Sequence, residues 1–205
     1  MAIEGWYANT VFILRWFHIL FGIIWIGHLY FFNFVNIPFQ GVLEKDLKPR
    51  VNPLLLPRAL WWFRWGAMLT FLFGWTLLFV KYSGGDLWKD AATGMMSHRA
   101  MWILAGALFG SIMWFNVWFV IWPAQRQIIG WVKAAQAPPE MPALAKRAAL
   151  FSKINTYLSA PMLFCMIAPN NYGSINAVTF IVVLAISMVI VAHLYKISTK
   201  VGTTI

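Results

Sequence analysis

Apolar residues occur along this chain in five long runs, and polar and charged residues are concentrated in the segments between them. Each run has about 20 residues or more, the length that an α-helix needs to cross the hydrocarbon core of a bilayer. The runs cover residues 9–36, 60–80, 95–122, 148–168 and 175–195. The pattern therefore predicts an all-α integral membrane protein in which residues 1–205 form one bundle of five transmembrane helices.

Prolines refine the limits of these runs. Pro123 directly follows the third run and is expected to end that helix, whereas Pro161 lies inside the fourth run and is expected to kink it. The longest segment outside the runs, near residues 130–146, contains Ala-Pro-Pro-Glu-Met-Pro, which is typical of a loop. The sequence shows no clear internal repeat and indicates no soluble domain.

The composition agrees with a membrane protein. Hydrophobic residues make up 61% of the chain and charged residues only 11%, whereas about a quarter of a soluble domain is charged. The net charge of +10 could indicate a nucleic-acid partner. The cations, however, lie in loops between apolar runs rather than on one soluble face, so nucleic-acid binding is not expected.

The loop charges predict an orientation. Most of the Lys and Arg residues follow the first and third runs or lie in the C-terminal tail, and the other side has only Lys81, Lys89 and Arg99. Because loops with excess Lys and Arg face the cytoplasm, we expect a periplasmic N-terminus and a cytoplasmic C-terminus in a bacterial inner membrane. The first run is too long for a signal peptide and no basic segment precedes it, so we expect it to be retained.

The four histidines, His18, His28, His98 and His193, all lie in or at the mouth of the apolar runs. An ionisable side chain at this depth is costly and indicates a functional site. Neutral imidazole is also the usual protein ligand of haem iron. His18 and His28 are ten residues apart on one helix, which separates them by about 15 Å and about 80° of rotation. One metal ion cannot bind both, but two stacked cofactors can take one each.

Depth in the bilayer suggests partners for these two histidines. His28 and His193 both lie roughly 28 Å from the outer ends of their helices, which predicts a bis-histidine site for one haem b. His18 pairs less closely in depth with His98, and cross-pairings remain open. Arg15, one turn before His18, is a candidate partner for a haem propionate, although it can equally reach the outer interface.

Other kinds of site find little support. Cys165 is the single cysteine, so no disulfide or thiolate cluster forms within the chain. The six acidic residues lie outside the runs, which argues against carboxylate chemistry in the membrane. Asn33, Asn36 and Asn116 lie within or at the ends of runs, where hydrogen bonding between helices is the expected role.

Three segments resemble the membrane domain of the PuuD-type urate hydroxylases: residues 15–33 (Arg-Trp-Phe-His to Phe-Asn), residues 116–125 (Asn-Val-Trp-Phe-Val-Ile-Trp-Pro-Ala-Gln) and residues 155–164 (Asn-Thr-Tyr-Leu-Ser-Ala-Pro-Met-Leu-Phe). The resemblance implies a multi-span inner-membrane domain, commonly fused to a cytochrome c that accepts electrons from urate oxidation. This chain is shorter than the full membrane domain and contains no Cys-x-x-Cys-His motif. We therefore expect it to work with a separate cytochrome c.

These observations lead to three hypotheses. The first is a membrane electron-transfer subunit with one or two haem b groups, which passes electrons between a quinol or substrate and a cytochrome c within a larger redox complex. The second is the membrane domain of a urate hydroxylase, and the third is a structural subunit without a cofactor. A copper site is a weaker possibility, because no Met-His cluster is present to supply it. The first hypothesis describes a redox subunit rather than a stand-alone enzyme. Its expected partners are other membrane subunits and membrane lipid.

Overall fold

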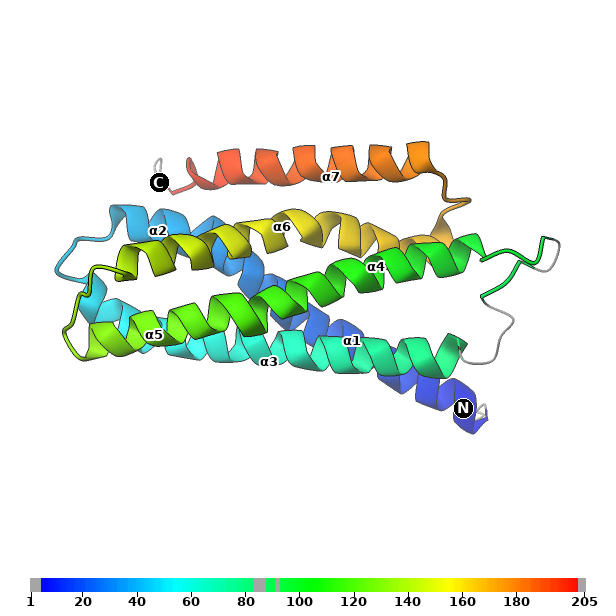
Figure 1. The fold of residues 1–205 in the computed structure, drawn as a ribbon, viewed down its shortest axis with the longest axis horizontal. Helices are drawn as coiled ribbons and strands as arrows, with labels where there is room; N and C mark the ends of the chain where they lie inside the picture. The colour runs from blue at the N-terminus through cyan, green and yellow to red at the C-terminus, as the bar shows by residue number, and fades with distance from the viewer. Residues whose placement is uncertain (1–4, 83–87, 91–92, 203–205) are drawn as a thin grey trace.

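The computed structural model describes residues 5–82, 88–90 and 93–202, and within them the chain is helical apart from loops and one isolated bridge between Lys89 and Met96. Five long helical segments run along the bundle in alternating directions, and the two termini lie at opposite ends (Figure 1). The elements are α1 Trp6–Tyr30, η1 Phe31–Asn36, α2 Ile37–Val42, α3 Lys48–Tyr82, α4 His98–Phe115, η2 Asn116–Ile121, α5 Trp122–Lys133, α6 Met141–Asn171 and α7 Ala177–Ser198.

Four helical segments are long and apolar enough to cross a membrane: Trp6–Val42, Lys48–Lys81, His98–Lys133 and Ala177–Ser198. The fifth predicted span lies in α6, which has 31 residues but a more polar sequence. Its buried face carries Ser152, Asn155, Thr156 and Ser159, so α6 turns polar groups inward while neighbouring helices cover them. The all-helical membrane fold is confirmed, and the number of spans remains a prediction.

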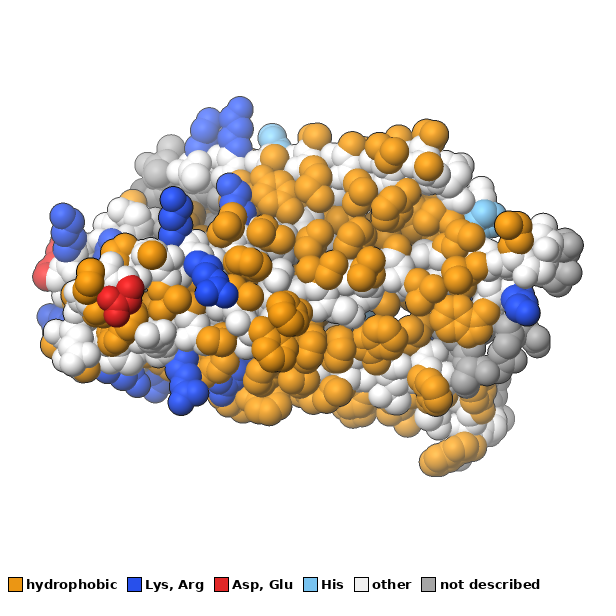
Figure 2. Space-filling view, in the orientation of Figure 1, with side chains coloured by type: hydrophobic (Ala, Val, Ile, Leu, Met, Phe, Trp, Pro, Cys, Tyr) orange, Lys and Arg blue, Asp and Glu red, His pale blue; other side chains and the backbone are white. Residues whose placement is uncertain are grey.

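The helices extend beyond the predicted runs at one end of the bundle. The segment Trp6–Val42 has 37 residues, or about 55 Å of helix at 1.5 Å per residue, against a hydrocarbon core of about 30 Å. Figure 2 shows hydrophobic side chains over most of the visible face and Lys and Arg gathered at the end where α2 and α5 lie. The bundle therefore has an apolar belt and a basic helical extension at one end.

The expectation that Pro123 ends the third helix is wrong, because a π-helix precedes it. The backbone N–H of Trp122 donates to the carbonyl of Val117, five residues back, and the helix continues through α5 to Lys133. Proline normally clashes with the carbonyl four residues before it, and the wider π-turn displaces that carbonyl. The loop predicted near residues 130–146 is correspondingly confined to residues 134–140.

The same arrangement occurs a second time, which reveals a repeat that the sequence does not show clearly. In η1 the backbone N–H of Ile37 donates to the carbonyl of Phe32, and Pro38 follows as the second residue of α2. Each repeat thus consists of a long helix, a six-residue π-helix, a short helix that begins with X-Pro, and a returning helix. The two pairs, α1 with α3 and α4 with α6, run in the same directions, and α7 packs against α6 (Figure 1).

The described residues contain two buried apolar clusters, and the larger one lies between the two repeats in the middle of the bundle. Its fully buried members come from α1, α3, α4 and η2, among them Trp25, Leu29, Phe63, Met113 and Val117. Interior side chains of this kind hold helices in register through close packing rather than through exclusion from water, because lipid is as apolar as leucine. The core fixes α1 against α3, and a groove lies between these two helices.

Candidate functional site

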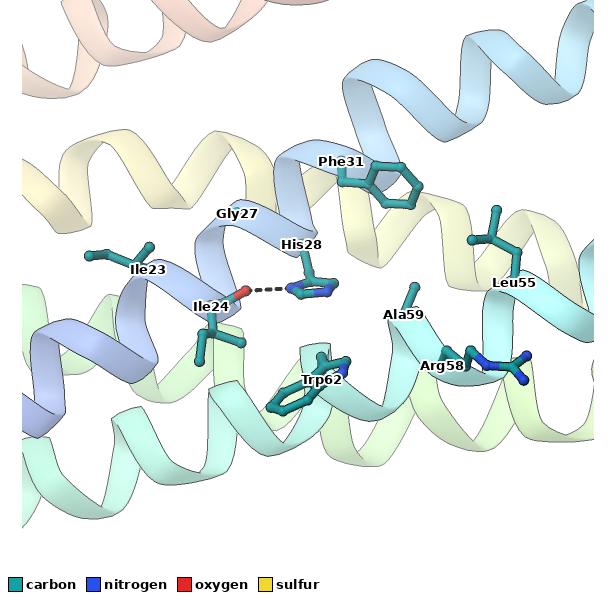
Figure 3. A pocket seen from close by; sticks show the side chains of 9 residues that line it. All are labelled: Ile23, Ile24, Gly27, His28, Phe31, Leu55, Arg58, Ala59 and Trp62. Carbon is teal, nitrogen blue, oxygen red and sulfur yellow. Dashed lines mark hydrogen bonds between the residues drawn. The ribbon is translucent and has the colours of Figure 1, made fainter.

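A groove of about 500 Å³ lies between α1 and α3, and it contains His28 (Figure 3). Its walls are mostly apolar, and two of its residues, His28 and Arg58, bear ionisable side chains. The volume falls within the range of about 300–1,000 Å³ that is typical of sites for cofactors and small ligands. The lining residues are Ile23, Ile24, Gly27, His28, Phe31, Leu55, Arg58, Ala59 and Trp62.

A backbone carbonyl orients the imidazole of His28. The Nδ1 atom lies 2.7 Å from the carbonyl oxygen of Ile24, one turn earlier on α1. Because a carbonyl oxygen can only accept, Nδ1 carries the proton and donates it to this bond. In the neutral imidazole this leaves Nε2 as the acceptor, and the ring extends from the Ile24 carbonyl into the space beside Ala59 and Trp62 (Figure 3). This is the arrangement that prepares a histidine to bind a metal.

The groove opens sideways toward the belt that faces lipid. Ile23 is 67% exposed and Trp62 is 51% exposed, so both line the mouth rather than an enclosed cavity. Beyond its chain neighbours and the backbone of its own helix, Gly27 has no atom within 4 Å of the position that a Cβ would take, which leaves room for a flat group beside His28. A hydrophobic ligand can therefore enter from the membrane without unfolding the bundle.

Arg58 supplies positive charge at one end of the groove. Its guanidinium group lies along α3 on the far side of Leu55 and Ala59 from Ile23 (Figure 3). One of its terminal nitrogens donates to the carbonyl of Leu54, and the guanidinium has further N–H groups available for an anionic ligand. The groove thus combines an imidazole acceptor, apolar walls and a terminal cation.

His18 has a different environment, in the contact between α1 and α3. Its Nδ1 atom lies 2.9 Å from the carbonyl oxygen of Thr70, so Nδ1 is again the donor. The ring lies directly on Gly74, where a Cβ would come within 2.7 Å of the imidazole Cε1. His18 is therefore seated in a close helix contact that requires glycine opposite it.

The structure does not bring the predicted histidine pairs together. His193 is exposed on α7 and does not line the groove of His28. His98, at the exposed start of α4, accepts a hydrogen bond from the backbone N–H of Ile175, whereas the neighbours of His18 are on α3. Neither His98 nor His193 supplies a second ligand from within the described chain at the groove.

The remaining predicted site residue, Arg15, is exposed on α1. Its charge acts on Lys81 at the C-terminal end of α3, so it lies toward the end of the bundle opposite the basic extension. No group of three or more His, Cys, Asp or Glu side chains suited to a metal ion occurs in the described part of the chain.

A buried polar seam joins α6 to the two π-helices. Asn116 in η2 donates to Asn155, which donates to the carbonyl of Met113, at 2.8 and 2.9 Å. In η1, Asn33 donates to Ser152 at 2.8 Å and accepts from the hydroxyl of Tyr195 at 2.8 Å. The role in hydrogen bonding between helices expected for Asn33 and Asn116 is confirmed.

Sequence reasoning missed the α6 side of this seam. Its signal is present in the sequence, because Ser152, Asn155 or Thr156, and Ser159 recur every three or four residues and so lie on one face of a helix. The hydrogen bonds of the seam fix the rotation of α6 about its own axis, relative to the half of the bundle that contains the His28 groove.

The residues of the His28 groove suit one of the two faces of a haem b group. One imidazole nitrogen is free to bind iron, apolar side chains surround it, and Arg58 can pair with a carboxylate at the end of the groove. His28 is the single imidazole among the lining residues, so the groove would offer one nitrogen ligand to such a group. The bis-histidine arrangement expected from helix depth has no counterpart at this groove.

Comparison with known proteins adds one match. A family model described as urate oxidase N-terminal matches residues 86–203, which is more than half of the chain. The matched region extends from the segment before α4 to the end of α7 and includes His98 and His193, whereas His18 and His28 lie before it. No curated protein and no solved structure matches the chain significantly.

Proposed function

This chain belongs to the urate oxidase N-terminal family, and we propose that it is the membrane domain of a urate hydroxylase system. The observation that carries the proposal is the family match through α4, α5, α6 and α7. The resemblance of residues 15–33 extends the likeness to α1. The bundle itself supports a membrane-embedded role through its four apolar helical segments.

Hydroxylation of urate with oxygen from water releases electrons and protons in equal numbers, so it needs an electron acceptor. The 205 residues contain one cysteine and hence no Cys-x-x-Cys-His motif for covalent haem. We assign the acceptor role to a cytochrome c on another polypeptide, which docks with this domain in a larger complex. The basic end of the bundle faces the cytoplasm of the bacterial inner membrane in this proposal.

The groove at His28 supports a second proposal, that the domain holds haem b and transfers electrons through it. A bound haem b would accept and release one electron at a time. The Nε2 atom of His28 would hold the iron, and the carbonyl of Ile24 orients the imidazole for this role. Arg58 would pair with a propionate, and Ile24, Phe31 and Trp62 would form apolar walls around the group.

The first proposal is tested by urate-dependent reduction of cytochrome c. The full chain is reconstituted in lipid vesicles, oxidised cytochrome c is added, and the absorbance of the reduced form is followed after addition of urate. We expect reduction that needs both urate and the protein. A rate no higher than that of protein-free vesicles, from protein with native helix content, contradicts the proposal.

The second proposal is tested by the visible spectrum of the purified protein and by pyridine haemochrome quantitation. We expect b-type bands in the wild type, their loss in His28→Ala, and their retention in His193→Ala and His98→Ala, because both of these side chains are exposed and outside the groove. Full haem content in His28→Ala rejects the site. A colourless wild-type protein rejects haem binding without affecting the urate test.

A further inference from the structure

Arg64 is a charged residue in the middle of the long helix α3, within a segment apolar enough to cross a membrane. Its guanidinium carbon lies 3.8 Å from the ring centroid of Trp122 and 6.0 Å from that of Trp118. The indole N–H of Trp118 donates to the carbonyl of Arg64 at 3.2 Å. These contacts hold the arginine in one place on the surface between α3 and α5.

A second cation lies next to this arginine. Arg126 follows Trp122 by one turn of α5, which places both on the same face of that helix. Its charge acts on Arg64, and no salt bridge from either arginine to a carboxylate occurs in the described residues. In addition, the Nε atom of Arg64 is buried and has no hydrogen-bond acceptor. Two neighbouring cations, one of them with an unpaired buried donor, create a local positive potential that attracts an anion.

The position of the pair along the bundle identifies the anion. Trp61 and Trp65 are exposed close to Arg64 on α3, and tryptophans at this density mark the boundary between hydrocarbon and headgroups. An apolar surface continues from there along α3 and α4, where Trp65 packs on Trp118 and Phe71 stacks on Trp114. A ligand that places a phosphate at the two arginines and acyl chains along these aromatic rings matches both the cationic and the apolar surface.

We propose that Arg64 and Arg126 form a binding site for the phosphate of an anionic phospholipid from the leaflet at the basic end of the bundle. The guanidinium of Arg64 is oriented by Trp122 and reaches toward that leaflet, because side chains on a helix lean toward its N-terminus and α3 begins at the basic end. Arg126 supplies the second positive charge. The site is separate from the His28 groove, and none of its residues lines that groove.

The test uses the full chain in detergent, titrated with phosphatidylglycerol or with zwitterionic phosphatidylcholine, with bound lipid counted by native mass spectrometry. We expect preferential binding of phosphatidylglycerol and a loss of about fivefold in affinity for Arg64→Gln and for Arg126→Gln, the effect of one cation at an anionic surface. Arg147→Gln removes a charge from the same end of the bundle at an exposed position on α6 and is expected to bind as the wild type does.

Two outcomes overturn the proposal. Equal loss in Arg64→Gln, Arg126→Gln and Arg147→Gln shows a diffuse effect of positive charge rather than a site. Displacement of the bound lipid by urate or inorganic phosphate at matching concentrations shows that the arginines bind a free anion instead. Arg126 is exposed, so its variant is expected to fold and provides the test even where Arg64→Gln does not.

Discussion

Gly74 is the position where the structure predicts a large effect from the addition of a single methyl group. In Gly74→Ala the new Cβ would lie 2.7 Å from Cε1 and 2.8 Å from Nδ1 of His18, against a carbon contact distance of about 3.5–4.0 Å. The imidazole must therefore shift by about 1 Å. That shift breaks its 2.9 Å hydrogen bond to the carbonyl of Thr70.

The magnitude follows from three contributions. Overpacking costs about 1–3 kcal/mol, and loss of the hydrogen bond in a membrane costs about 0.6 kcal/mol. The higher helix propensity of alanine offsets about 1 kcal/mol. We expect Gly74→Ala to lower the free energy of unfolding by about 0.6–2.6 kcal/mol, the net of these three contributions. Gly110→Ala is the matched control, because no atom beyond its chain neighbours and its own helix backbone lies within 4 Å of its Cβ position, and it is expected to be neutral or stabilising.

The assay is unfolding in mixed micelles by titration with dodecyl sulfate, with helix content followed by circular dichroism. Gly74→Ala as stable as Gly110→Ala would refute the reasoning. The double variant His18→Ala with Gly74→Ala adds a second check. Because removal of the imidazole relieves the clash, the double variant is expected to lose at least about 1 kcal/mol less than the sum of the single variants.

Three further predictions concern the seam, the topology and the buried thiol of Cys165. Asn155→Leu leaves the buried amide of Asn116 without its acceptor, so it is expected to lower stability by about 1–3 kcal/mol in the same titration, and an unchanged midpoint would contradict this. In intact cells, a membrane-impermeant maleimide is expected to label Met95→Cys and to label Gly130→Cys only after lysis; the reverse pattern would invert the orientation. Cys165 is fully buried and is expected to react with a permeant maleimide only after unfolding, which mass spectrometry measures.

Hydrophobic periodicity predicts the helices well and their ends poorly. The apolar runs coincide with the observed helices except at the starts of the third and fifth runs, where residues 95–97 and 175–176 precede α4 and α7. The agreement is close because a bilayer requires continuous helix across it. The extension of α3 back to Lys48 and of the third helix to Lys133 lies beyond the predicted apolar runs. Packing between helices decides the structure there, and Pro38 and Pro123 are accommodated by π-turns that depend on tertiary contacts.

The histidines show where reasoning from the sequence reaches its limit. Depth along a helix follows from residue number, so His18 and His28 are correctly placed on α1 at different levels. Rotation about the helix axis and the choice of neighbours do not follow from depth, and His28 therefore faces α3 rather than the helix that carries His193. The groove itself needs the relative position of α1 and α3, which no local pattern encodes.

The two π-helices have a consequence for how this chain can change in length. A π-turn contains one residue more than the α-helical turn it replaces, so deletion of one residue from η1 would rotate α2 by about 100° relative to α1. Gln40 would leave Asn52, with which it exchanges hydrogen bonds of 2.7 and 3.1 Å. Deletion of one residue from η2 would rotate α5 relative to α4 in the same way. Among related sequences we therefore expect insertions and deletions to fall between the long helices, and the spacing from each π-helix to its proline to remain constant.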